Sequence, residues 1–214
     1  MESNQASRLS AQGLELWRGE RRLFHDFSLS VEPGDLVHVK GPNGVGKTTL
    51  LRMLGGLIAP EDGEIRWAGE CIRKRADEFR ADLLYIGHRD GVKGGLTARE
   101  NLRFLARLHG ALPDADTLDS ALAAWGLGAH LDRPCRTFSA GQRRRVALSR
   151  LSLHPGRLWL LDEPFTSLDT AGAELLRSHI TQNLERGGMV VITAHLETVL
   201  GDRPFRTVQL GELQ

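Results

Sequence analysis

A glycine-rich loop constrains the fold of this chain more than any other feature of its sequence. The loop spans residues 41–48, follows a β-like run at 36–40 and precedes a helical pattern that includes Leu50, Leu51 and Leu54. Glycines allow backbone N–H groups to turn toward phosphate oxygens, and the N-terminus of the following helix adds a positive partial charge. Strand, loop and helix in this order predict a phosphate-binding loop in an α/β protein.

The side chains of this loop suit a nucleoside triphosphate. Lys47 supplies a full positive charge to the β- and γ-phosphates, and Thr48 offers a hydroxyl oxygen suited to Mg²⁺. We therefore expect Mg²⁺ at Thr48 and ATP along the loop. The loop residues expected to bind ATP are Gly41, Pro42, Asn43, Gly44, Val45, Gly46, Lys47, Thr48 and Thr49.

A second candidate site lies where the apolar run 158–161 ends in two acids, Asp162 and Glu163. A run of successive apolar residues is typical of a strand buried on both faces of a parallel sheet, and such sheets bind ligands at the carboxyl ends of their strands. Burying unpaired carboxylates is costly, so these two need a reason to be there. We expect Asp162 to hold Mg²⁺ through its water shell and Glu163 to polarise the water that attacks the γ-phosphate.

The turn at 139–142 predicts a second helix N-terminus. Ser139 is a natural N-cap, Gly141 leaves the backbone exposed, and Ala140 and Gln142 complete the turn, which is therefore suited to meet an anion. One loop of this chain already serves one γ-phosphate, so we interpret the turn as reaching the nucleotide of a second copy. An ordinary capped helix is the alternative.

Alternating short strands and helices indicate an α/β fold with an open sheet. In the first third, turn signals with few helices between them predict an antiparallel β layer beside that sheet. The expected strands lie at 13–17, 27–31, 36–40, 65–67, 83–86, 158–161, 189–193 and 207–210.

Strand signals are missing between residue 97 and about 153, which predicts an all-helical lobe at 96–154 inserted into a catalytic core at 1–87 and 155–214. A capping box from Thr97 to Glu100 opens its first helix, and Leu102, Leu105 and Leu108 are expected on one face. A connector with four glycines at 87–95 would allow the lobe to move relative to the core. We expect the core and the inserted lobe to form a single domain over 1–214.

The net charge of the chain limits the kinds of partner that it can bind. The 214 residues carry a formal net charge of +1, which does not favour nucleic acid as a partner. We interpret the run 143–145, three arginines, as a solvated face or a partner contact.

No apolar run reaches the roughly 18 residues that span a bilayer, and the polar start does not resemble a signal peptide, so we expect a cytoplasmic chain. Cys71 and Cys135 are expected to be reduced thiols.

These motifs resemble those of the ATP-binding subunits of ABC transporters over essentially the whole chain. Residues 41–48 match the Walker A motif, Asp162 and Glu163 end the Walker B motif, and 139–142 match the core of the signature LSGGQ. The resemblance implies a RecA-like P-loop core, a dimer with two ATP molecules sandwiched between the copies, and multi-spanning membrane partners. It also implies that Asp169, in the D-loop, contacts ATP across the interface and that His195 is a catalytic switch histidine.

Two positions depart from the family pattern. His88 stands where the family usually has a glutamine that binds Mg²⁺, and imidazole is a poorer ligand for that ion. At the position of the aromatic residue that stacks on adenine the chain has Arg18, next to Trp17. A guanidinium plane can also stack on a base, so either residue is a candidate.

Within the family, the sequence around His88, the 139–142 core and the segment 162–169 are similar to the ATPases of cytochrome c maturation. That resemblance implies a protein at the cytoplasmic face of the bacterial inner membrane, whose hydrolysis of ATP drives haem export or release of a haem-loaded chaperone. His109, His154 and His179 lack the context of haem ligands, so haem contact belongs to the partners. The remaining alternatives are the ATPase of an exporter for another cargo, and a nucleotide-sensing adaptor, against which the full catalytic set argues. The chain is too short for a DNA-repair ATPase with a long coiled coil or for a translation factor with two cassettes.

Overall fold

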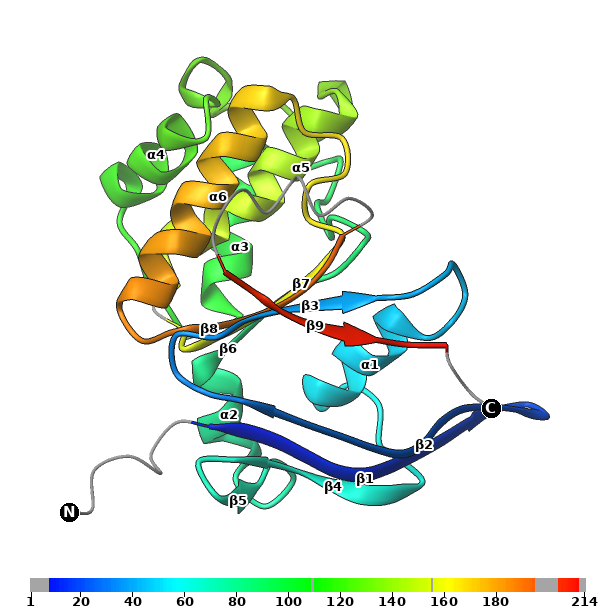
Figure 1. The fold of residues 1–214 in the computed structure, drawn as a ribbon. Helices are drawn as coiled ribbons and strands as arrows, with labels where there is room; N and C mark the ends of the chain where they lie inside the picture. Colours follow the sequence, from blue (N-terminus) through cyan, green and yellow to red (C-terminus); the bar gives the residue numbers. More distant parts are fainter. Residues whose placement is uncertain (1–7, 109, 155, 195–203, 212–214) are drawn as a thin grey trace.

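A computed structural model describes residues 8–108, 110–154, 156–194 and 204–211 of this chain. Two β-sheets lie on either side of helix α1 (Lys47–Leu54), and further helices cover the opposite face of the parallel sheet (Figure 1). This arrangement is the predicted α/β fold with an antiparallel β layer.

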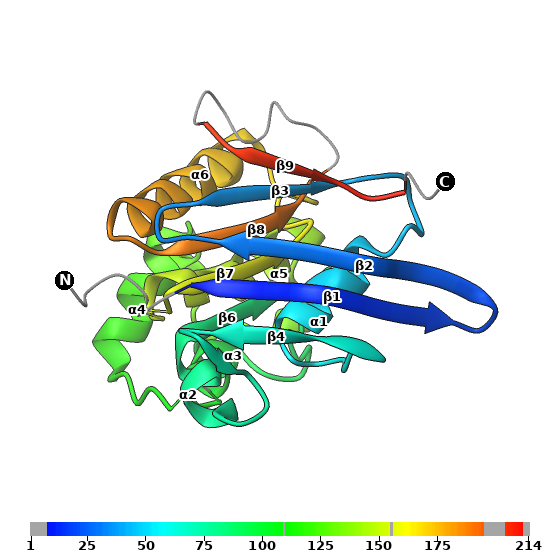
Figure 2. The ribbon, with the colours of Figure 1, turned by 60° about the horizontal axis from the view of Figure 1, so that its bottom comes forward.

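The antiparallel sheet has the strand order β2-β1-β4-β5. Figure 2 shows β1 and β2 as a long hairpin. Both strands are longer than predicted, because irregularities in their pairing interrupt the alternation of apolar and polar residues by which strands are recognised. The strand β5 and the short helix α2 were not predicted. The bounds are β1 (Leu9–Arg18), β2 (Arg21–Val31), β4 (Asp62–Trp67), β5 (Glu70–Cys71) and α2 (Ala76–Asp82).

The second sheet is parallel throughout and has the order β6-β7-β8-β3-β9. Each of its strands overlaps a predicted one. The bounds are β3 (Leu36–Lys40), β6 (Leu83–Ile86), β7 (Leu158–Asp162), β8 (Met189–Thr193) and β9 (Arg206–Gln209).

The central strands are buried on both faces, as their continuous apolar runs predicted. On β7, Leu158 and Leu160 belong to the core that also contains α1 and the antiparallel sheet. Trp159 and Leu161 point the other way, into the core beneath α6 (Thr170–Glu185). Successive strand residues face opposite sides, so a run without polar residues fills both cores at once.

The helical lobe comprises α3 (Ala98–Arg107), α4 (Ala115–Ala124) and α5 (Ala140–Leu148). The predicted capping box of α3 is present in both directions between Thr97 and Glu100. Leu102 and Leu105 are buried, but Leu108 is 64% exposed, so placing it on the same face was wrong. Leu108 is the C-cap of α3. A helix has about 3.6 residues per turn, so two steps of three residues place Leu108 about 120° around the axis from Leu102.

The end of the lobe also differs from expectation. Helix α5 stops at Leu148 and is followed by a 3-10 turn (Ser149–Ser152), whereas the residue pattern predicts one helical stretch from Arg143 to Leu153. Further 3-10 turns lie at Gly128–His130 and Cys135–Thr137. Among the helices of the described ranges, each is too short or too polar to cross a bilayer.

Candidate nucleotide site

The 41–48 loop joins β3 to α1 and depends on glycine at its turns. Gly41, Gly44 and Gly46 have φ angles of 143°, 77° and 115°, in the left-handed region that other residues rarely adopt. A Cβ atom on Gly41 would lie 2.6 Å from the carbonyl oxygen of Leu210. The loop therefore needs its glycines both for backbone conformation and for close packing.

Lys47 and Thr48 begin α1 and point their polar atoms in different directions. The Nζ atom of Lys47 donates to the carbonyl oxygens of Gly41 (2.8 Å) and Pro42 (3.1 Å), so the ammonium group lies inside the curve of the loop. The Thr48 hydroxyl donates to Oδ2 of Asp162 at 2.8 Å. This bond joins the phosphate-binding loop to the end of β7, although 114 residues separate the two in sequence.

Thr193 holds both acidic residues, and sequence reasoning assigned it no role. Its hydroxyl donates to Oδ1 of Asp162 at 2.9 Å and accepts the backbone N–H of Glu163 at 2.8 Å. Asp162 and Thr193 are paired in register on the neighbouring strands β7 and β8. A threonine at the carboxyl end of the next apolar run was the signal available in the sequence.

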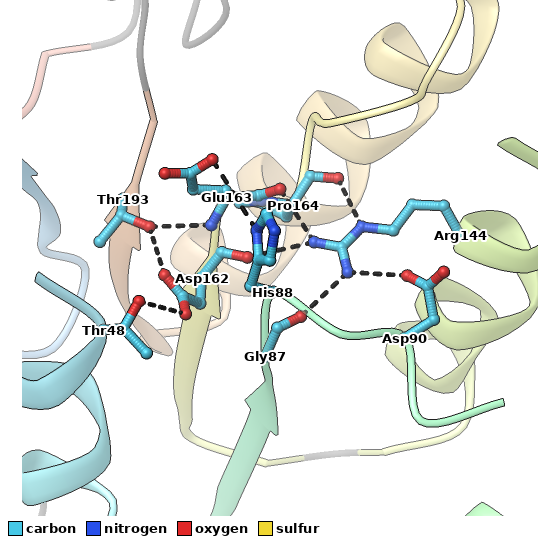
Figure 3. Close-up of polar contacts among 9 residues, drawn as sticks. All are labelled: Thr48, Gly87, His88, Asp90, Arg144, Asp162, Glu163, Pro164 and Thr193. Carbon is cyan, nitrogen blue, oxygen red and sulfur yellow. Dashed lines mark hydrogen bonds and ion pairs between the residues drawn. The ribbon is translucent and has the colours of Figure 1, made fainter. Parts of the chain in front are cut away.

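Glu163 lies just beyond β7, beside His88. It has a φ angle of 48°, in the left-handed region, and one of its carboxylate oxygens lies 3.9 Å from Nδ1 of His88 (Figure 3). His88 follows the end of β6, the strand paired with β7. The predicted metal candidate and the predicted catalytic carboxylate are therefore neighbours at one edge of the parallel sheet.

A cavity of about 410 Å³ runs along this edge. Arg18 lines it, whereas Trp17 is absent from its lining, and the guanidinium of Arg22 lies 5.5 Å from the centre of the Trp17 ring. Of the two candidate residues for stacking on an adenine base, Arg18 is the one that lines this cavity. The lining consists of Arg18, Leu23, Asn43, Gly44, Gly46, Lys47, Thr48, Thr49, His88 and Glu163.

The 139–142 turn is exposed at Ser139 and Ala140, is partly buried at Gly141 and Gln142, and takes no part in lining this cavity. Ser139 caps α5 as predicted, because its hydroxyl accepts the N–H of Gln142 while the Gln142 side chain accepts the N–H of Ser139. A Cβ atom on Gly141 would lie 2.7 Å from the carbonyl oxygen of Ser167. The start of α5 is thus pressed against the loop that follows Glu163.

The Asp169 side chain is bonded within its own chain. It caps α6 by accepting the N–H of Gly172 at 2.8 Å, and it pairs with Arg145 at 2.5 Å. The N–H of Gly172, followed by the Arg145 guanidinium, lowers the pKa of Asp169 below its usual value. These contacts hold Asp169 in its negatively charged form next to α5.

Arg144 corrects the interpretation of the three arginines as a solvated face. Its residue surface is only 2% exposed, and its guanidinium reaches Asp90 and four backbone carbonyl groups. A hydrophilic run on a helix predicts exposed side chains, but such a side chain can be buried where other segments supply polar groups that bond with it. Here the ends of β6 and β7 supply them.

Other predicted residues lie elsewhere. Val45 is buried in the core, so a contact from it to ATP would have to come from its backbone. His195 lies outside the described residues, and Ala194 is the nearest residue before it that is described. Both cysteines are free, Cys135 buried and Cys71 partly exposed. Within the described ranges, no three or more His, Cys, Asp or Glu side chains form a cluster that could hold a metal on their own.

Comparisons with known proteins agree with this geometry. A family model described as ABC transporter matches residues 24–166. The chain is 50% identical over 192 residues to the cytochrome c biogenesis ATP-binding export protein CcmA of Nitrosomonas europaea, a match that covers 90% of each chain. It is 46% identical over 203 residues to the protein of the same name in Dechloromonas aromatica, covering 95% of this chain and 100% of that one.

Solved structures show the same fold. An ABC transporter ATP-binding protein from Pyrococcus furiosus superposes with a TM-score of 0.80 at 25% identity, covering 95% of this chain and 98% of that chain. The ATP-binding subunit of another ABC transporter superposes with a TM-score of 0.84 at 24% identity, covering 94% of this chain and 85% of that chain.

Proposed function

This chain belongs to the ABC transporter family, and we propose that it hydrolyses ATP as a subunit of a cytochrome c maturation complex. The observation that carries the proposal is the meeting of four side chains at one edge of the parallel sheet. Lys47 and Thr48 begin α1, while Asp162 ends β7 and Glu163 follows it, and the Thr48 hydroxyl bonds Asp162 directly.

The residues at this edge suit Mg²⁺. A hydroxyl oxygen and a carboxylate oxygen, 2.8 Å apart on Thr48 and Asp162, are hard donors of the kind that this ion prefers. His88 is the third candidate ligand. Bound Mg²⁺ would neutralise charge on the β- and γ-phosphates.

The other tasks, which are to bind the phosphates and the base and to activate the water, fall to separate residues of the chain. The N–H groups of the 41–48 loop and the Lys47 ammonium would hold the phosphates, with the N-terminus of α1 adding positive partial charge. Arg18 would stack on the base. Glu163 would accept the proton of the attacking water, and His195 would hold the γ-phosphate and water in line.

A complete site needs a second copy of the chain. The 139–142 turn lies outside the lining of its own chain's cavity, which supports a role at the partner's nucleotide together with the 167–169 loop. Charge-assisted hydrogen bonds to a γ-phosphate contribute roughly 1.5–3 kcal/mol each, so several of them across one interface hold it closed until ATP is cleaved. When the interface opens after cleavage, the helical lobe would transmit that movement to the membrane subunits.

The nucleotide sandwich is tested with Glu163→Gln. This change removes the base but keeps the shape of the side chain, so ATP should bind without being cleaved and the dimer should accumulate. The mass in solution, measured by light scattering with saturating ATP and Mg²⁺, should double, whereas ADP should leave a monomer. A variant that stays monomeric with ATP contradicts the sandwich for the isolated subunit.

The cargo requires a separate test, since the site residues bind nucleotide whatever is transported. The relatives named for cytochrome c biogenesis favour a complex at the cytoplasmic face of the bacterial inner membrane that exports haem or releases a haem-loaded chaperone. Extraction from membranes in mild detergent, followed by identification of the bound proteins, should recover membrane proteins that handle haem. Recovery of a drug-efflux permease would instead favour an exporter of another cargo.

A further inference from the structure

Arg144 is a buried guanidinium with every donor used. It has five N–H groups, and five acceptors surround it. Nε donates to the carbonyl of Pro164 (3.2 Å), and Nη2 donates to the carbonyls of Asp162 (3.2 Å) and Glu163 (2.9 Å). Nη1 donates to the carbonyl of Gly87 and to Oδ1 of Asp90, each at 3.0 Å (Figure 3).

These contacts hold the backbone of Glu163 in its unusual conformation. The residue lies in the left-handed region, which costs free energy for any side chain larger than glycine. Its N–H is bonded to Thr193 on one side, and on the other its C=O accepts bonds from Arg144 and from the N–H of Thr166. Because the direction of the Cα–Cβ bond follows from the backbone, these bonds set the direction in which the Glu163 side chain leaves the main chain.

The same arginine belongs to the helix that begins at the 139–142 turn. Arg144 lies in the second turn of α5, and its guanidinium bonds the ends of both β6 and β7. A shift of α5 must therefore move the carbonyls of 162–164 or break the bonds to them. Gly87, a second acceptor, precedes His88, so the shift also reaches the ring beside the Glu163 carboxylate.

We propose that Arg144 is a positioning residue that links the two nucleotide contacts of one chain. Through it, the location of the 139–142 turn would determine the orientation of Glu163 in the same chain's own site. When this turn binds the ATP held by the partner, Glu163 of the same chain as the turn would take the orientation that hydrolysis requires. The inference rests on the proposed sandwich of two copies.

The first test is Arg144→Lys. Lysine keeps the charge but offers three donors at one point, so it cannot serve five acceptors spread around a planar fork. Turnover per bound ATP should fall about 100-fold, as for a catalytic group displaced by about 1 Å, while the KM for ATP and the number of ATP-binding sites stay within about twofold. Arg143→Lys is the matched control, since Nη1 of Arg143 donates to the carbonyl oxygen of Phe138 within the lobe, and it should retain wild-type turnover.

Asp90→Asn is a milder second variant, which keeps an oxygen acceptor for Arg144 but removes its negative charge. It should lower turnover about fivefold with an unchanged KM, because a bond between charged groups is stronger than one to a neutral amide. A purely structural role for Arg144 predicts instead a lower melting temperature and fewer ATP-binding sites in both variants, with normal turnover per site. That result overturns the proposal.

Mixed dimers distinguish an effect of Arg144 on Glu163 of its own chain from an effect on the partner's nucleotide. One copy keeps Glu163 and the other carries Glu163→Gln, so a single site hydrolyses ATP. Arg144→Lys should abolish most turnover when placed in the copy that keeps Glu163, and much less when placed in the other copy. Equal losses, or a larger loss from the second placement, overturn the link to Glu163. Failure of the parent Glu163→Gln dimer to form with ATP contradicts the proposed sandwich instead, and the link with it.

Discussion

At the scale of single residues, His38 shows how burial fixes a protonation state. Its ring lies on β3 and is 1% exposed, and Nε2 donates to the carbonyl of Ala194 at 3.0 Å. Nδ1 has no partner among the described atoms. Burial, which costs more for a charged ring than for a neutral one, lowers the pKa of His38 below its ordinary value of 6.5.

Acid should therefore destabilise the protein through His38. Near pH 7.5 the ring is neutral in both the folded and the unfolded chain. As the pH falls below about 6.5, only the unfolded chain takes up the proton, so the free energy of unfolding decreases by up to about 1.4 kcal/mol per pH unit until the folded pKa is passed. His38→Gln can still donate to Ala194 but does not titrate, so urea unfolding at pH 7.5 and 5.5 should show a smaller loss than in the wild type.

The partly buried ring of His179 keeps part of that acid effect in the variant, since burial also lowers its pKa. An acid-induced loss of the same size in wild type and His38→Gln would show that His38 does not contribute.

At the scale of elements, the contact between the start of α5 and the loop after β7 depends on the absence of a side chain. Inside a helix, alanine is favoured over glycine by about 1 kcal/mol. At Gly141 a Cβ would stand 2.7 Å from the carbonyl oxygen of Ser167, and backbone atoms cannot move aside as the end of a side chain can. The clash therefore outweighs the gain in helix propensity.

Gly141→Ala should separate α5 from this loop and lower the free energy of unfolding by about 1–3 kcal/mol, in the range of overpacked cores. ATP turnover should fall as well, because Glu163 begins the same loop. Urea unfolding and steady-state hydrolysis measure the two effects. Gly95→Ala is the matched control, since nothing lies within 4 Å of its added Cβ, and a stability equal to that control would refute the clash.

At the scale of the whole molecule, the nucleotide cavity is a junction between layers. Arg18 and Leu23 come from the antiparallel sheet, Lys47 begins the helix between the sheets, and Glu163 follows a strand of the parallel sheet. A ligand that contacts all of them binds only when the layers are assembled, so its binding free energy stabilises the entire fold.

A non-hydrolysable ATP analogue with Mg²⁺, at about 100 times its Kd, should therefore add about 2.7 kcal/mol to the free energy of unfolding. Thermal unfolding should show the midpoint rising in the wild type and in Lys74→Ala, which removes an exposed lysine away from the cavity. Lys47→Ala should show little or no rise at the same concentration. An equal rise in Lys47→Ala would place the nucleotide elsewhere.

The amino-acid sequence alone was enough for what short segments determine. The strand, loop and helix over 36–54, the strands of the parallel sheet, the capping box at Thr97, the N-cap at Ser139 and the fold class all followed from the periodicity and turn chemistry of neighbouring residues. The prediction for Leu108 was wrong because steps of three residues drift around a helix of about 3.6 residues per turn. The prediction for Arg144 was wrong because distant segments pair its guanidinium.

Tertiary structure alone decided which groups meet. Arg144 reaches Gly87 across 57 residues, and Thr193 reaches Asp162 across 31 residues. Folding brought Arg18, rather than Trp17, to the cavity lining. The physical reason is that a hydrogen bond depends on distance and direction in space, which strand order and helix placement set, whereas the spacing of residues along the chain reports only contacts between near neighbours.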